Sequence, residues 1–318
     1  MPLTLKDLDI RVNLPRLPSA INLFQLSAPA LGDRRRAIES LTKRFELGEL
    51  KTVELPDFVV FGSRRGEVQF FPASGAVIAR DGAAEAQAKD EERPWKNLQR
   101  VMRGDETRFT LERGQAEKLT KQARGLLDEA GLASEQMQAP AVELDQWAQL
   151  DERGREVRSG AGPATVSFQY AVEGVPVAGA GAKSLVFAEP DGEGARPSGV
   201  FHAWRPLGKP VKLGLTGTEE SLKSGLLRDP LLTTFHGRGM RISITRLDFR
   251  LMALPAFVSQ RWLYPVFQVE GSAVPPRDGQ RLDFGRFVHV ATAEQYAKVG
   301  AYAHYLQQAT ADAPDRAQ

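Results

Sequence analysis

The stretch GVPVAGAGAKSLVFAEPDGEG, residues 174–194, decides the fold, because it resembles a phosphate-binding loop as well as a turn between strands. A loop of the G-x-x-x-x-G-K type needs a lysine directly after its second glycine and opens a helix. Gly174 and Gly179 have this spacing, but Ala180 occupies the lysine position. After Lys183, the apolar run SLVFAE ends in a glycine-rich turn, which predicts a strand entering a hairpin. We therefore expect a bend between two strands, with no bound nucleotide.

Strands are predicted on both sides of this bend. Alternating or continuous apolar patterns mark strands at 164–172, 182–189, 198–207, 240–254, 264–274 and 282–291. Within 240–254, the apolar residues change face between Ile244 and Leu247. One extra residue in a strand has this effect, so we expect a β-bulge near Thr245 and Arg246.

Helices are predicted where apolar residues recur on one helical face. The stretches are 33–47, 112–132, 218–227 and the residues from 292 onward. Asp33 is expected to cap the first helix, and Thr216 or Thr218 the third. Thr292 and Gln295 have the spacing of a capping box that opens the last helix.

The order of these elements predicts an α+β fold of two related units, each an antiparallel sheet with helices packed on one face. Residues 1–80 form the first unit, with strands at 21–26, 52–62, 66–71 and 75–80 around the first helix. Residues 81–107 are expected to be a polar connector pinned by Trp95, 108–308 the second unit, and 309–318 a disordered tail.

Composition excludes several classes of protein and site. The 42 Lys and Arg nearly balance 40 Asp and Glu, and both signs are mixed along the chain, which argues against a nucleic-acid partner. No apolar stretch approaches the ~20 residues of a membrane-spanning helix, and no membrane partner is expected. The chain has no cysteine, so it has no disulfide or thiolate site. As written it is expected in the cytoplasm, because charges replace the centre of a secretion signal; a removed leader would place it outside the cytoplasm.

The central strands resemble a known family. Tyr170, Gly174, Pro176, Val177, Gly179 and Gly181 match the strand and turn pattern of the PepSY or FTP domain. This propeptide-type domain precedes thermolysin-like and fungalysin-like metallopeptidases and occurs in other bacterial proteins. The helix at 114–132 takes the place of the family's leading helix, and residues 254–271 resemble a segment that follows such domains. The resemblance implies tandem units, a bacterial source, a location outside the cytoplasm and a peptidase partner.

The four histidines, His202, His236, His289 and His304, do not have the spacing of ligands on one helix, so no metal or other cofactor is expected. His202 and His289 alternate with apolar residues on strands, which favours partly buried structural roles. His236 lies in the stretch TTFHGRGM, interpreted as a glycine-rich turn that exposes the imidazole beside Arg238.

A carboxylate pair is conceivable on two successive strands. Asp248 and Glu270 could face each other, as the carboxylates of glycosidases do, and with His236 and Arg250 they would form a hydrolytic site. Their neighbours Arg246 and Arg250 favour a simpler interpretation, in which cross-strand ion pairs lie on a solvated face.

Trp204 and Arg205 end a predicted strand, where they could bind a carboxylate of a partner or pack on each other at the sheet rim. Helices on one face of each sheet leave the other face open. The leading hypothesis is therefore a non-catalytic interaction or regulatory protein that holds a protein partner, with a peptidase as one candidate, through an open sheet face or edge. The candidate contact residues are Trp204, Arg205, His236, Arg238, Arg246 and Arg250. A structural subunit that binds copies of itself and the hydrolase above remain alternatives.

Overall fold

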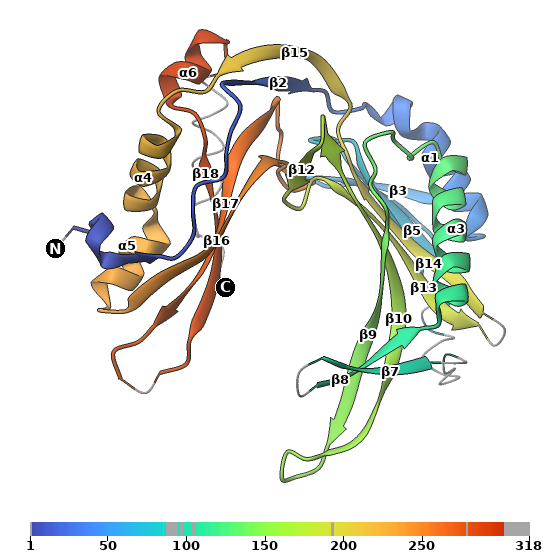
Figure 1. The fold of residues 1–318 in the computed structure, drawn as a ribbon. Coiled ribbons are helices and arrows are strands. Elements are labelled where there is room, and N and C mark those ends of the chain that lie inside the picture. The colour runs from blue at the N-terminus through green and yellow to red at the C-terminus, as the bar shows by residue number, and fades with distance from the viewer. Residues whose placement is uncertain are drawn as a thin grey trace.

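The computed structural model describes residues 2–84, 86, 95, 98–103, 106–191, 194–277 and 279–301. These residues form two eight-stranded sheets and one two-stranded hairpin. The sheets are the two sides of an arch, and helices cover the outer face of each (Figure 1). Within the described residues, no helix is long and apolar enough to cross a membrane. The predicted α+β class is confirmed.

The first sheet is antiparallel throughout. Its strands, in spatial order, are β3 (Lys51–Glu54), β4 (Val59–Gly62), β5 (Gly66–Phe71), β6 (Ala76–Asp81), β14 (Gly194–Ala203), β13 (Lys183–Asp191), β10 (Glu156–Gln169) and β9 (Ala141–Leu150). Its helices are α1 (Leu31–Arg44) and α3 (Arg113–Glu129). The small hairpin of β7 (Leu98–Arg103) and β8 (Glu106–Leu111) lies near β9.

The second sheet mixes antiparallel pairs with two parallel ones. Its strands are β11 (Ala171–Val172), β12 (Val175–Ala178), β16 (Arg241–Met252), β17 (Trp262–Val274), β2 (Ala20–Leu26) and β15 (Leu207–Gly214), with β1 (Leu8–Ile10) beside β16 and β18 (Leu282–His289) beside β17. Its outer elements are α4 (Thr218–Arg228), α5 (Pro230–Gly237), α6 (Ala293–Lys298) and the short 3₁₀ helix η1 (Leu5–Asp7).

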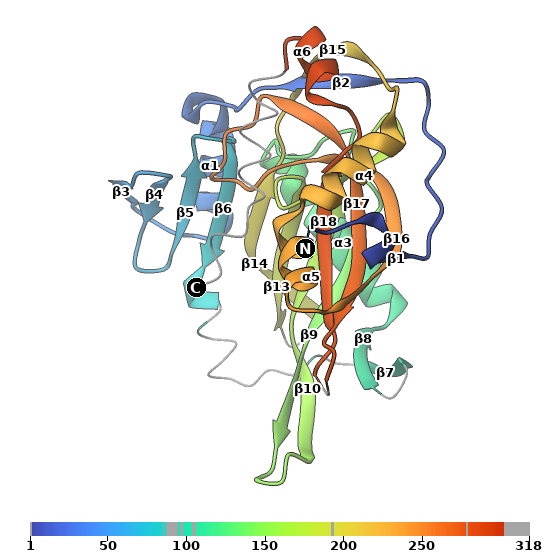
Figure 2. The ribbon, with the colours of Figure 1, turned by 90° about the vertical axis from the view of Figure 1, so that its left-hand side faces the viewer.

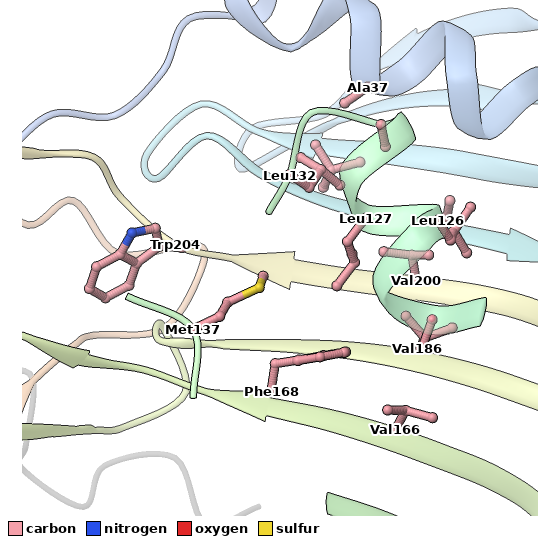
Figure 3. Packing of buried hydrophobic residues seen from close by; sticks show 14 of the residues in the cluster. Ala37, Leu126, Leu127, Leu132, Met137, Val166, Phe168, Val186, Val200 and Trp204 are labelled. Carbon is pink, nitrogen blue, oxygen red and sulfur yellow. The ribbon is translucent and has the colours of Figure 1, made fainter. Parts of the chain in front are cut away.

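The core of the first sheet lies between its strands and the two outer helices. A row of residues that pair with each other on neighbouring strands crosses the sheet under these helices. It consists of Phe61, Val68, Ala79, Val200, Val186, Val166 and Val142. The apolar stripe of α3 packs on it, and Figure 3 shows Leu126 and Leu127 close to Val186 and Val200. Hydrophobic burial of this row is what fixes α1 and α3 on one face only.

The glycine-rich stretch around residues 174–182 connects the two sheets. β10 and β13 are neighbours in the first sheet, but β11 and β12 between them form a tight hairpin that pairs with β16 of the second sheet. Glu173 and Gly174 make its turn with φ of 51° and 78°. A Cβ at Gly179 or Gly181 would clash with a backbone carbonyl of the segment after β16, so glycine permits this close approach. Ser184 lies in a strand, and the predicted strand and turn are confirmed.

Several local predictions hold and others need correction. A register shift between Ile244 and Arg246 confirms the bulge, and Thr292 and Gln295 form the predicted capping box. Asp33 is not the cap of α1; as its third residue, it accepts the Ala30 N–H at 2.9 Å.

Three other elements differ from the sequence interpretation. Gly217, with φ of 65°, precedes α4 in place of either predicted threonine cap. The stretch interpreted as a turn around His236 is the helix α5, because Asp229 accepts the N–H groups of its first turn. The strand predicted at 52–62 is two strands, because Leu55 N–H bonds the Phe58 carbonyl in a turn.

The two sheets do not follow the predicted ranges 1–80 and 108–308. β2 from the first range pairs with β15 and β17, whereas β6 pairs with β14 from the second range. In the predicted connector 81–107, the Trp95 indole donates to the Gly162 carbonyl at 2.7 Å, and β7 begins at Leu98. The predicted tail, 309–318, lies outside the described residues.

Candidate functional site

The helix-free face of the first sheet carries a second row of residues that crosses all eight strands. This row is called the cross-sheet row below. Except on β3, each of its residues is next in sequence to a residue of the buried row that runs from Phe61 to Val142. Its members are Val53, Val60, Gln69, Ile78, Phe201, Leu185, Ser167 and Ala141. Its central members are half-buried, and Val53 at the edge is 52% exposed. Five large apolar side chains therefore lie on a face that no helix among the described residues covers.

One end of the cross-sheet row continues into a small apolar cluster. Phe71, Ala76 and Ala203 are buried there beneath Ala256, which comes from the loop between β16 and β17. Phe201 belongs to the edge of this cluster, and the Lys183 ammonium lies 5.8 Å from its ring centroid. Ile78 of the row packs against the same cluster, whereas Val60 and Leu185 lie outside it and are half-buried. Contiguous exposed apolar surface of this kind is typical of interaction sites.

The helix-free face of the second sheet carries charged side chains beside a small apolar cluster that includes Met252, Val266 and Phe287. Arg246 bonds Asp248 at 2.7 Å and Glu270 at 3.5 Å, and Arg250 bonds Asp248 at 3.0 Å. Gln268 donates to the other oxygen of Glu270 at 2.7 Å. The predicted cross-strand ion pair is present for Glu270, which pairs with Arg246, whereas Asp248 pairs with the two arginines of its own strand. Each carboxylate is held by guanidinium or amide donors.

The two helix-free faces look toward each other across the inside of the arch, because both helix layers are on its outside (Figure 1). The view turned by 90° shows α4 and α5 in front of the strands that they cover (Figure 2). β2 and β15 span the top of the arch, where the chain passes from one sheet to the other.

His236 lies away from this surface. It sits near the end of α5, whose Leu232 and Phe235 pack into the core on the helix-covered side of β16. Asp248 alternates with core-facing Leu247 and Phe249, so its carboxylate is on the opposite face of the strand. The structure does not bring His236 together with the carboxylates. The exposed Arg238 at the end of α5 is on the outer layer too.

Trp204 and Arg205 are in the interior where the two sheets join. The Trp204 ring stacks on Tyr170 with centroids 4.3 Å apart, and it is 6% exposed. Arg205 is 2% exposed and donates to the carbonyls of Leu254, Pro255 and Val258, in the loop that follows β16. Burial lowers the pKa of Arg205 to about 10. These two side chains fasten the sheets together, so they are not part of the surface proposed below.

A buried polar chain lies beside Trp204. Tyr170 Oη and Ser184 Oγ are 2.8 Å apart, and Ser184 Oγ is 2.8 Å from Nδ1 of His202. Burial lowers the pKa of His202 to about 3 and raises the pKa of Tyr170. The serine and histidine have the contact of a nucleophile and its base, but both side chains are buried. His202, 2% exposed, is more deeply buried than the partly buried position predicted for it.

Sequence reasoning missed this polar chain for a specific reason. Ser184 and His202 face each other on neighbouring strands, a pairing set by the strand register rather than by spacing in the sequence. Among the described residues, no group of three or more His, Asp or Glu side chains is placed to hold a metal ion.

Comparisons with known proteins give a likeness of shape only. No protein-family model matches the chain. No curated protein matches it either. A crystal structure of an uncharacterized protein from Eubacterium rectale ATCC 33656 is similar over 85% of this chain and 83% of that one, with a TM-score of 0.47 and 8% identity.

Proposed function

We propose that this protein is a non-catalytic binding protein that holds a segment of a protein partner against the helix-free face of the first sheet. The observation that carries the proposal is the cross-sheet row, with five large apolar side chains in line across a face without helices in the part of the chain that the structure describes. Covering such surface releases about 25 cal/mol for each Å² removed from water. A partner segment with apolar side chains gains this free energy.

Two further features support a protein segment as the partner. The cross-sheet row includes two polar residues, Gln69 and Ser167, and Lys183 lies beside it. These polar groups can bond a backbone or an acidic side chain. The opposite wall of the arch carries Arg246 and Glu270, which suits charged side chains at the rim of an interface. The PepSY or FTP resemblance suggests a peptidase as the partner.

The test is affinity capture from an extract of the source cells, followed by a binding measurement with the captured protein after purification. The immobilised chain is compared with Leu185→Asp, which puts a charge in the middle of the cross-sheet row. The matched control is Leu31→Asp, because Leu31 is an exposed leucine at the start of α1 on the outer layer. We expect the partner to bind the chain and the control equally and to bind Leu185→Asp at least about tenfold more weakly.

Three outcomes would contradict the proposal. Equal loss with Leu31→Asp would move the interface to the outer layer, and equal affinity for all three proteins would exclude the cross-sheet row. If the captured protein is the chain itself, sedimentation at several concentrations will show self-association, which is the structural-subunit alternative. Thermal unfolding of each variant checks that the substituted chains are folded.

A further inference from the structure

A small cavity opens where the end of α1, the turn between β4 and β5 and the start of β14 meet. Its volume is about 270 Å³, and its lining consists of Arg44, Glu46, Arg65, Arg196 and Pro197. Three arginines from segments far apart in the sequence converge on it. We propose that this cavity, called the arginine cavity below, binds the phosphate group of a small molecule.

Arg196 is held in place before any ligand arrives. Its Nη2 atom lies 2.8 Å from Oδ2 of Asp81, whose side chain is 1% exposed, and Asp81 also accepts the Ala84 N–H at 3.0 Å. The buried carboxylate fixes one edge of the guanidinium. The Arg196 side chain remains 41% exposed, so its other N–H groups reach solvent at the cavity. A fixed planar fork of this kind matches the oxygens of a phosphate.

Arg65 has a partner that a ligand can replace. Its guanidinium is 3.3 Å from Glu46, and the two side chains are 45% and 72% exposed. Exposed ion pairs contribute little free energy because solvent screens them and both side chains lose conformational freedom. A phosphate dianion carries more charge than the Glu46 carboxylate and offers more acceptor oxygens, so it competes for Arg65.

Glu46 occupies an unusual position for its residue type. The N–H groups of Glu46 and Leu47 bond the carbonyls of Lys43 and Thr42, the bonding pattern that ends a helix with one left-handed residue. Glu46 is that residue, with φ of 50°, where glycine is the usual choice. The disfavoured conformation places its carboxylate at the mouth of the arginine cavity beside Arg65. We interpret Glu46 as the group that occupies Arg65 until the ligand displaces it.

Arg44 supplies the excess positive charge. It is exposed on the last turn of α1 and makes no hydrogen bond or ion pair within the part of the chain that the structure describes. The cavity is slightly smaller than the pockets of about 300–1,000 Å³ that hold drug-sized ligands. Its size and charge therefore suit a free phosphate ion or a small phosphomonoester.

The experiment is isothermal titration of inorganic phosphate, and separately of phosphoserine, into the whole chain at low ionic strength. We expect saturable binding at one site. The double variant Arg44→Ala/Arg65→Ala should bind at least about tenfold more weakly, because two charge-assisted contacts are lost. Glu46→Gln should bind more tightly than the unchanged chain, because it removes the competing charge and keeps the length of the side chain.

Arg35→Ala is the matched control, since it removes one exposed arginine from the same helix outside the cavity. Binding of phosphate and phosphoserine with equal affinity identifies the ion as the ligand, and tighter binding of phosphoserine identifies a phosphomonoester. The proposal is overturned if neither binds saturably at millimolar concentration, if Arg35→Ala weakens binding as much as the double variant, or if Glu46→Gln leaves affinity unchanged.

Discussion

The helix-free faces of the two sheets differ in whether their side chains have partners within the chain. On the first sheet, the half-buried Leu185 and Phe201 belong to a row that no helix of the described residues covers. On the second sheet, Arg246 and Asp248 pair with each other and with their neighbours. Charges that pair on a solvated face require no further partner, whereas exposed apolar surface gains free energy when it is covered. This difference is the reason why we propose the first sheet as the interaction surface.

The sequence contains the reason for this difference. In β13, the run LVF after Ser184 is apolar on both faces of the strand, a pattern typical of strands covered on both sides. In β16, RLDFR alternates charged and apolar residues, a pattern typical of strands covered on one side. The first sheet therefore has the composition of a two-sided core, but helices on only one side.

Asp substitutions at two adjacent positions of β13 should give the largest difference in the free energy of unfolding. Val186→Asp puts a carboxylate in the buried row and should lower the free energy of unfolding by more than about 4 kcal/mol, enough to abolish soluble protein. Leu185→Asp, one residue away on the helix-free face, should keep a cooperative transition in urea. Equal loss of folded protein in both variants would contradict the assignment of one covered and one open face.

Acid should lower the free energy of unfolding, because each sheet contains a histidine that burial keeps neutral. Burial lowers the pKa of His202 to about 3 and of His289 to about 4, from 6.5. Below about pH 6.5 the unfolded chain binds protons that the folded chain does not, so stability should fall from pH 6.5 toward pH 4 and should not depend on these groups above pH 7. Urea midpoints across this range measure the effect.

The control for the acid effect is His202→Gln, which keeps an acceptor for Ser184 but cannot be protonated. Its stability should depend on pH less steeply, by about 1.4 kcal/mol per pH unit for the one proton removed. An unchanged slope would mean that His202 does not remain neutral in the folded chain.

The polar chain beneath the first sheet should have a smaller effect. Ser184→Ala leaves Tyr170 Oη and His202 Nδ1 buried without the hydroxyl that joins them, at a cost of about 1–3 kcal/mol. Tyr170→Phe should lower the free energy of unfolding less in the Ser184→Ala variant than in the unchanged chain, because Tyr170 and Ser184 belong to one hydrogen-bond network. Additive losses in urea unfolding would show that the two hydroxyl groups act independently.

Local structure was predictable where a few neighbouring residues decide it. The stripe of α3, the capping box at Thr292 and the bulge after Ile244 all follow from side-chain periodicity and short-range hydrogen bonds. The α5 helix was missed because the glycines of its end suggested a turn, although Asp229 followed by Pro230 is a start signal for a helix.

Long-range pairing was not predictable from these local patterns. Nothing within residues 171–178 indicates that β12 pairs with β16 rather than staying in the first sheet. The arginine cavity depends in the same way on β14 lying beside β6, which brings Arg196 to Asp81. The open face of the first sheet was expected in general terms, but its residues follow from the strand register.

A substitution on the charged face of the second sheet should change the free energy of unfolding least. Asp248→Asn removes the carboxylate shared by Arg246 and Arg250, and the change in the free energy of unfolding should stay below about 1 kcal/mol, because these side chains are partly solvated. High salt should reduce the difference further, since it screens exposed charges. Urea unfolding at low and high salt measures both. A loss as large as that of Ser184→Ala would mean that the ion pairs are a structural element of the sheet, and the contrast between the two open faces would then no longer single out the first sheet.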